Sequence, residues 1–439
     1  MTDNEKNISD CENSCVKPSE VDLKRAGIIT DTFVEKVENA ASVRIGSSAE
    51  EKKSAVVIRD FYNKILGLPA RQEPFTVMPL AGRFGVPIYG VIYAVALAFY
   101  IIGILVDEKN VSYAFLALAL VVSAAAAAMI TVQVLLNRNT FNALFPKRTS
   151  YNVLSSIEPK GNPECTLIIG GHYDSDMDRS DLLTFLKDKN LPSWLSGLLK
   201  SLSLASLPVL FVLAIVAMCL PGRNAGTKAF LFLFPTIFCG LAIFYLITAF
   251  SYKKKKNGSV GREGLQAAGI TLAVADYLRL HPDLVPDNFR IVLACFGAKE
   301  CGAKGSEQLI LQHYGRDSFL INPVFVNFAK LGENGNTVIQ GDRKYKNMYD
   351  LKLNNVAFNA LKDAGLDPSF AYSKDLFTDS TPFAKHKIPT VTVELKKGDN
   401  EFSGVYNEAF EGALNVTLNT VDYMKKRQDR YKGAEEEIM

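Results

Sequence analysis

Charge is absent from four long stretches of this chain of 439 residues, although charged residues make up 22% of it. About 20 apolar residues suffice to cross a hydrocarbon core of roughly 30 Å. The composition therefore predicts an integral membrane protein with four transmembrane helices, paired as hairpin 1 (86–136) and hairpin 2 (194–252). The uncharged stretches are Val86–Val106, Val111–Leu136, Leu204–Leu220 and Ala229–Phe250. Hairpin 2 opens with an interfacial lead-in, Trp194–Ser203, in which Trp194 is the expected anchor.

Other residues and motifs that the sequence lacks reduce the number of possible functions. No Asp, Glu, Lys, Arg or His lies inside an expected span, which disfavours a transporter or proton path. The N-terminal residues 1–20 have no apolar core, so they do not form a signal peptide. The seven cysteines form no CxxC pair, and an odd count favours reduced thiols in a cytosolic setting. A net charge of +3 gives no support for nucleic-acid binding.

Basic residues flank the expected spans unevenly. They are concentrated at the span ends that join the rest of the chain, and only three lie in the two opposite loops. By the positive-inside rule, the soluble part and both termini face the cytoplasm. The flanking residues are Arg83, Arg138, Lys147, Arg148, Lys200 and Lys253–Lys256, and the loops hold Lys109, Arg223 and Lys228.

Outside the hairpins, apolar β-branched segments alternate with helical patterns, which predicts an α/β domain with a mixed, mostly parallel central sheet flanked by helices. The expected domain comprises 29–85, 137–193 and 253–430, with a disordered polar tail (1–28) and a charged tail (431–439). Expected strands are Glu73–Met78, Tyr151–Ile157, Thr166–Gly170, Arg290–Phe296, Pro323–Phe328 and Pro389–Glu394. Expected helices are Asp31–Asn39, Ser54–Leu66, Leu265–Leu280 and Glu408–Lys426.

Four short motifs carry polar residues, and two of them follow strand ends, where chemistry is concentrated in such sheets. The motifs are Arg44–Ser47, Gly170–Ser175 (GGHYDS), Gly297–Ser306 and Asp379–Phe383. Together and in this order, they resemble those of the M28 family of zinc aminopeptidases and carboxypeptidases. The resemblance covers nearly all of the soluble sequence, so both hairpins are expected to be insertions in a peptidase-like domain.

The resemblance implies a site for two zinc ions, and part of it is kept. His172 matches a histidine ligand of the first site, and Asp174 matches the carboxylate that orients it. Glu300 matches a glutamate ligand of the second site. Glu263 stands where the bridging aspartate is expected, with one methylene more. Lys299 stands at the position of the general base, where a charged ammonium cannot accept a proton.

Two further ligand positions are lost. Ala329 stands where an aspartate is expected and cannot bind metal, and Asn407 replaces a histidine with a poor zinc ligand. Zinc binding is therefore expected to be weak or absent. We expect Lys299 to stand between Glu263 and Glu300 and neutralise them. His386, in the late loop, is the candidate substitute ligand.

These substitutions predict a catalytically degenerate pseudopeptidase, with its former cleft near the cytoplasmic face of the membrane and a role in binding, assembly or regulation. The alternative is an active zinc exopeptidase with a modified metal site. The expected partners are the lipid bilayer, a peptide or protein ligand in the cleft, and a second copy of the chain. Self-association would use the Ala-rich stretch Ser123–Ala128, since small residues allow close contact between helices.

Overall fold

The computed structural model describes residues 15–135, 145–175, 193–220, 224–248, 261–332, 335–342, 347–373, 378–398 and 405–438. The chain forms two compact units. The α/β unit comprises residues 1–77, 148–176 and 256–439, and the helical unit comprises 78–147 and 177–255. The division agrees with two insertions into one domain.

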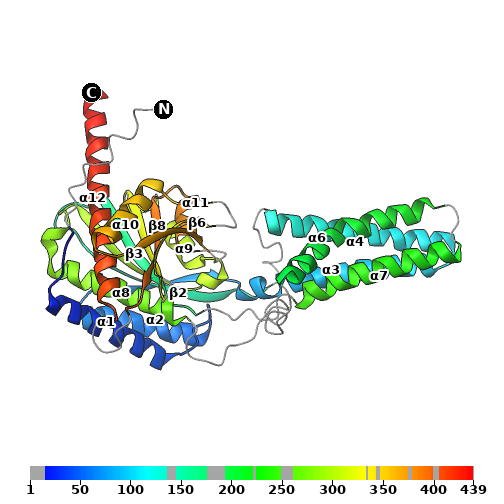
Figure 1. Ribbon diagram of the computed structural model, residues 1–439, viewed down its shortest axis with the longest axis horizontal. Helices are drawn as coiled ribbons and strands as arrows, with labels where there is room; N and C mark the ends of the chain where they lie inside the picture. The colour runs from blue at the N-terminus through cyan, green and yellow to red at the C-terminus, as the bar shows by residue number, and fades with distance from the viewer. Residues whose placement is uncertain are drawn as a thin grey trace. The chain divides into compact units, whose positions relative to one another are not determined.

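An eight-stranded sheet forms the centre of the α/β unit, in the order β1-β2-β4-β3-β5-β8-β6-β7 (Figure 1). The four central strands are parallel to one another, whereas β1, β2 and β6 each pair antiparallel with a neighbour. The prediction of a mixed, mostly parallel sheet is confirmed. The strands are β1 (Ala70–Val77), β2 (Arg148–Ile157), β3 (Cys165–His172), β4 (Phe289–Phe296), β5 (Pro323–Gly332), β6 (Asn336–Asp342), β7 (Pro368–Ser373) and β8 (Thr390–Lys396).

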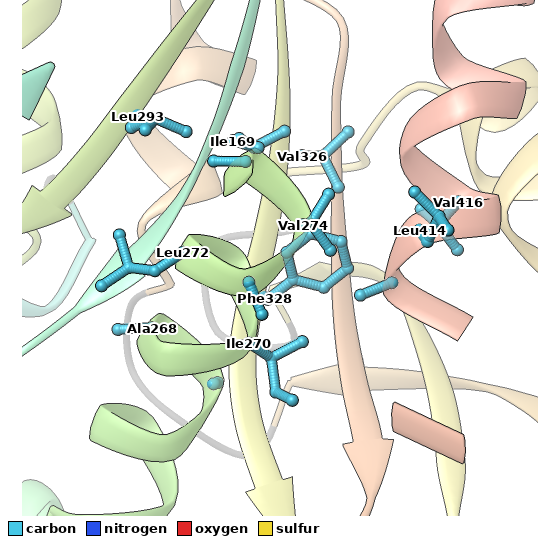
Figure 2. Close-up of a cluster of buried hydrophobic side chains, with 14 of the residues drawn as sticks. Ile169, Ala268, Ile270, Leu272, Val274, Leu293, Val326, Phe328, Leu414 and Val416 are labelled. Carbon is cyan, nitrogen blue, oxygen red and sulfur yellow. The ribbon is translucent and has the colours of Figure 1, made fainter. Parts of the chain in front are cut away.

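Helices cover both faces of this sheet. The buried strands carry apolar side chains on both faces, and each face needs a covering layer. Along β3, Leu167 and Ile169 point into one core, and Ile168 between them points into the other. The larger core includes residues of α8 and α12, which pack near Ile169, Val326 and Phe328 (Figure 2). On this face lie α1 (Glu20–Ala40), α2 (Ala49–Phe61), α8 (Arg262–Leu280), α10 (Leu351–Asp363) and α12 (Asn407–Ile438). The smaller core includes α9 (Lys304–His313) and α11 (Ser380–Lys385).

The two expected tails are shorter than the sequence suggested. Helix α1 begins at Glu20, within the stretch expected to be disordered. Ser19 and Asp22 form a capping box there, which satisfies backbone N–H groups at the helix start. At the other end α12 continues to Ile438, through the expected charged tail.

The helical unit is a bundle of four helices, each packed against two neighbours (Figure 1). The helices are α3 (Pro79–Leu105), α4 (Lys109–Leu135), α6 (Ser193–Cys219) and α7 (Ala225–Thr248). Gly103 allows a close crossing of α3 and α4, because a Cβ there would lie 2.8 Å from the side chain of Leu116. Ser123 and Ala126 of the Ala-rich stretch are buried inside the bundle, whereas Ala125 and Ala128 are exposed.

The described residues do not show the four expected spans. Two helices are long and apolar enough to cross a membrane, through Ile88–Leu105 and Lys109–Met129. Within the residues of α6 and α7 whose side chains the structure describes, the apolar stretches are Pro208–Cys219 and Ala225–Gly240. Residues 253–256, which contributed to the predicted orientation, lie outside the described residues, as do the side chains of Lys200 and Trp194.

Candidate functional site

His172 ends β3 and lies at the centre of the candidate site. Its strand fits closely between its neighbours, since a Cβ at Gly171 would lie 2.6 Å from the carbonyl oxygen of Phe328. Gly264 on α8 packs against the ring of His172, because a Cβ there would lie 2.6 Å from Nε2. The other ring nitrogen, Nδ1, lies 3.4 Å from Oδ2 of Asp379, which is 1% exposed. His172 is therefore held between the first turn of α8 and the residue before α11.

The structure places the carboxylate of Asp379 beside His172, while the orienting role expected of Asp174 remains a prediction. Asp174 accepts a hydrogen bond from the backbone N–H of Glu300, at 3.2 Å, through Oδ2. Burial raises the pKa of Asp174, and the nearby carboxylates of Glu300 and Glu51 raise it further. Asp174 thus supports the loop after β4, and the carboxylate of Asp379 beside His172 comes from a distant part of the chain.

Arg44 joins the segments that carry the site. Its buried guanidinium donates hydrogen bonds to the carbonyl oxygens of Tyr173 at 2.7 Å, Ala41 at 3.0 Å and Gly261 at 3.3 Å. Tyr173 follows His172, and Gly261 immediately precedes α8. Burial lowers the pKa of Arg44, while Glu38 and Asp174 oppose that shift. The arginine of the Arg44–Ser47 motif therefore fixes His172 relative to the helix that carries Glu263.

The loop after β4 has an unusual backbone. Ala298 and Ala303 have φ of 53° and 55°, in the left-handed region that non-glycine residues rarely adopt. Such conformations persist when surrounding contacts enforce them. Glu51 accepts a hydrogen bond from the backbone N–H of Ala298 at 3.1 Å, and Asn152 donates to the carbonyl oxygen of Gly305 at 2.8 Å. With the bond to Asp174, these contacts fix the segment that presents Lys299 and Glu300.

Lys299 and Glu300 form an ion pair on this loop. Nζ of Lys299 lies 3.7 Å from Oε1 of Glu300, and the lysine side chain is 4% exposed. The buried ammonium thus faces the carboxylate that would be a zinc ligand. Glu263 lies on the exposed first turn of α8, with its carboxylate 3.9 Å from a Cβ position at Gly332. The pairing of Lys299 with Glu300 agrees with the expected neutralisation, while a contact with Glu263 remains a prediction.

The remaining predicted positions offer no replacement ligand. Ala329 lies in a bulge of β5, where the register with β8 shifts between Phe328 and Lys330. Asn407 is the first residue of α12. His386 is exposed at the C-terminal end of α11, whereas Asp379 precedes its N-terminal end. Six helical residues separate these ends by about 9 Å, so His386 and His172 lie near opposite ends of one helix.

These residues do not fit a zinc centre. Among the described residues, no group of three or more His, Cys, Asp or Glu side chains could hold a metal ion. Structural zinc sites take four ligands, and catalytic sites take three with an open position. Lys299 adds a positive charge beside one of the carboxylates that remain. The site can bind a polar group or stabilise the loop, but its donor set does not support zinc chemistry.

Comparisons with known proteins describe the fold alone. Neither a family model nor a curated protein sequence matches the chain. It is similar to an Acidobacteriales bacterium glutaminyl cyclase, with 12% identity, a TM-score of 0.46, and coverage of 94% of this chain and 97% of the other. It is also similar to BSAP, a zinc aminopeptidase from Bacillus subtilis, with 14% identity, a TM-score of 0.43, and coverage of 92% and 95%. An aminopeptidase from Aneurinibacillus sp. strain AM-1 gives 10% identity, a TM-score of 0.44, and the same coverage.

Two residues of the site had no predicted role. Glu51 is buried and accepts hydrogen bonds from the backbone N–H of Ser47 at 2.5 Å and from Oγ of Ser150 at 2.7 Å, in addition to that from Ala298. In the sequence it follows Ser48 with capping-box spacing, so it resembles an ordinary helix-start residue. Asp379 was visible only as part of a motif, because its proximity to His172 depends on the fold.

Proposed function

We propose that this protein is a membrane-anchored pseudopeptidase, in which a peptidase-like α/β domain has exchanged metal-dependent hydrolysis for a binding or regulatory role. The buried Lys299 beside Glu300 carries this proposal. In metal-dependent hydrolysis, a carboxylate acts as the general base on a metal-bound water. An ammonium at that position carries a positive charge in place of the negative one and cannot accept the proton. The loss of ligands at Ala329 and Asn407 supports the same conclusion.

The helical bundle supports anchoring in a membrane. Large apolar side chains on its outer surface are strongly exposed, including Val121 at 62%, Phe230 at 61% and Ile237 at 63%. Its interior instead contains hydroxyl groups, such as those of Tyr93 and Ser206. A bundle in water has the opposite arrangement, with polar residues outside. We propose that α3 and α4 cross the bilayer and that the basic flanks place the α/β unit in the cytoplasm.

Metal analysis and a peptidase assay on the full chain in detergent test the pseudopeptidase proposal. We expect far less than one zinc per chain and no hydrolysis of aminoacyl reporter substrates. Stoichiometric zinc, together with activity that is lost in His172→Ala, would overturn the proposal and favour the active exopeptidase with a modified site.

A restored variant provides the matched control. It combines Glu263→Asp, Lys299→Glu, Ala329→Asp and Asn407→His, which rebuilds the ligand set that the resemblance implies. We expect this variant to bind zinc under conditions in which the parent chain does not. Equal zinc contents in the two proteins would show that these four positions do not determine metal binding.

A further inference from the structure

The two edges of the eight-stranded sheet differ in how they are protected. An edge strand presents unpaired backbone N–H and C=O groups, and natural proteins guard such edges with proline and charge. On β1, Pro74 interrupts the edge, and Glu73 pairs with Arg71 at 2.7 Å. His313 covers the same strand, with Nε2 3.0 Å from Glu73 and Nδ1 2.6 Å from Asp317. This edge is closed to strand pairing.

Within the residues that the structure describes, the opposite edge, β7, lacks such protection. Its sequence, Pro-Ser-Phe-Ala-Tyr-Ser, contains no charged residue, and its only proline is the first residue. Phe370 is 40% exposed and Tyr372 is 47% exposed. Both point to one face of the sheet, since side chains two residues apart share a face. The ring of Phe370 stacks on Phe358 at 4.4 Å, which holds it in place.

Apolar residues beside β7 enlarge this surface. The hydroxyl of Tyr372 lies 3.7 Å from Sδ of Met348, which is 55% exposed. Leu351, at the start of α10, is 61% exposed. An uncharged edge strand that ends in an exposed apolar patch is the arrangement that pairs with another strand.

We propose that β7 pairs antiparallel with β7 of a second copy of this chain. In a symmetric pair, a two-fold axis perpendicular to the sheet leaves each residue and its copy on the same face. Directly opposed residues also share a face, so they must be an even number of positions apart in the sequence. The pair is therefore centred on a residue and not between two residues. Centring on Ala371 places Ala371 opposite its own copy. Phe370 then lies opposite Tyr372 of the second copy, and Tyr372 lies opposite Phe370 of the second copy.

This register explains why the occupant is a second copy. Directly opposed aromatic residues on one face stabilise an antiparallel pair. The pairing produces two such contacts from one short strand and brings no charged side chains of β7 together. An unrelated strand would have to supply the matching aromatic residue by chance, whereas the copy supplies it by symmetry.

Cysteine cross-linking of the full chain in membranes tests the register. Opposed residues of an antiparallel pair have Cα atoms about 4.5–5.5 Å apart, within the range for a disulfide. We expect Ala371→Cys to form a disulfide-linked dimer under mild oxidation. Ser369→Cys is the matched control, because its two copies would lie about 13 Å apart along the strands. The parent chain, with its native cysteines, gives the baseline.

A charge on the strand tests the interaction itself. Adding Tyr372→Lys to the Ala371→Cys chain should reduce the cross-linked fraction at least about tenfold, because Lys guards an edge. Val21→Lys, at a site on α1 that is 76% exposed, should leave it unchanged. Circular dichroism confirms that each variant is folded. Absence of a dimer in folded Ala371→Cys, equal yields at positions 369 and 371, or a yield that Tyr372→Lys does not lower would each overturn the proposal.

Discussion

Both units of this protein bury an apolar core, but they differ in the polar groups that they bury and in the apolar groups that they expose. The α/β unit buries charged side chains, each in contact with polar partners: Arg44 donates to three well-placed carbonyl groups, and Asp276 pairs with Arg25 at 2.5 Å. The bundle buries hydroxyl groups and exposes large apolar side chains such as Ile237. The proposed membrane anchoring would place the two outer surfaces in different solvents, and substitutions at matched positions can test it.

The largest effect is expected from Arg44→Ala. The substitution leaves buried carbonyl groups of Tyr173, Ala41 and Gly261 without their donor and disconnects the loop after His172 from α8. We expect a loss of about 3–5 kcal/mol in the free energy of unfolding of the α/β unit. Hydrogen exchange of the amides in β3 and β4 measures it. Arg44→Lys keeps the charge and some donors, so its free energy of unfolding should fall clearly less than that of Arg44→Ala. Equal losses of stability in the two variants would contradict this account.

Val121→Lys and Ile28→Lys form a matched pair across the two units. Val121 on α4 is 62% exposed, and Ile28 on α1 is 59% exposed. In a bilayer, a lysine at mid-helix costs about 3 kcal/mol. In water, a surface substitution usually changes stability by less than about 0.5 kcal/mol. Membrane-insertion yield and thermal stability of the two variants give the comparison, and similar results for both would show that the bundle surface faces water.

The pH dependence of the α/β unit should reflect Glu51. Burial raises the pKa of Glu51 from 4.5 to about 7, although its hydrogen bonds oppose the shift. The folded state then holds this proton more tightly than the unfolded state, so the free energy of unfolding falls as the pH rises from 4.5 to 7. The slope contributed by Glu51 should be roughly 1 kcal/mol per pH unit in the middle of this window.

Glu51→Gln tests this origin of the slope. The variant has no proton to exchange and should lose that contribution to the pH dependence. Its amide nitrogen cannot accept a hydrogen bond, so either Ser47 N–H or Ala298 N–H loses its acceptor, and the variant should also be less stable at pH 4.5 by about 1–2 kcal/mol. Hydrogen exchange at several pH values measures both effects, and an unchanged slope would contradict the assigned pKa.

The smallest effect is expected inside the bundle. The hydroxyl of Tyr93 on α3 donates to the carbonyl oxygen of Ser206 on α6 and lies 3.4 Å from Sγ of Cys239 on α7. Hydrogen bonds between helices in membranes contribute about 0.6 kcal/mol on average. Tyr93→Phe should therefore lower the thermal stability of the bundle only slightly. Phe99→Leu, at a position packed against the bundle core, provides a control for aromatic packing.

The sequence predicted the central strands more successfully than the edges of the sheet. Segments such as Thr166–Gly170 and Arg290–Phe296 are continuous apolar runs, which indicate buried parallel strands without further context. Strand β7 has no such run, because one of its faces is exposed. Four apolar stretches also suggested four spans, whereas among the described residues two helices are long and apolar enough to cross a membrane.

The sequence by itself determined that long stretches of the bundle helices carry no charge, that Ala329 cannot bind a metal and that Asn407 would be a poor zinc ligand, since these points follow from residue type alone. Only the tertiary structure decided that Asp379 lies beside His172, that Glu51 and Asp174 hold the loop of Lys299, and that His386 lies at the far end of α11. Residue types limit the chemistry that is available. Which side chains meet depends on contacts between segments hundreds of residues apart, and local patterns do not encode those distances.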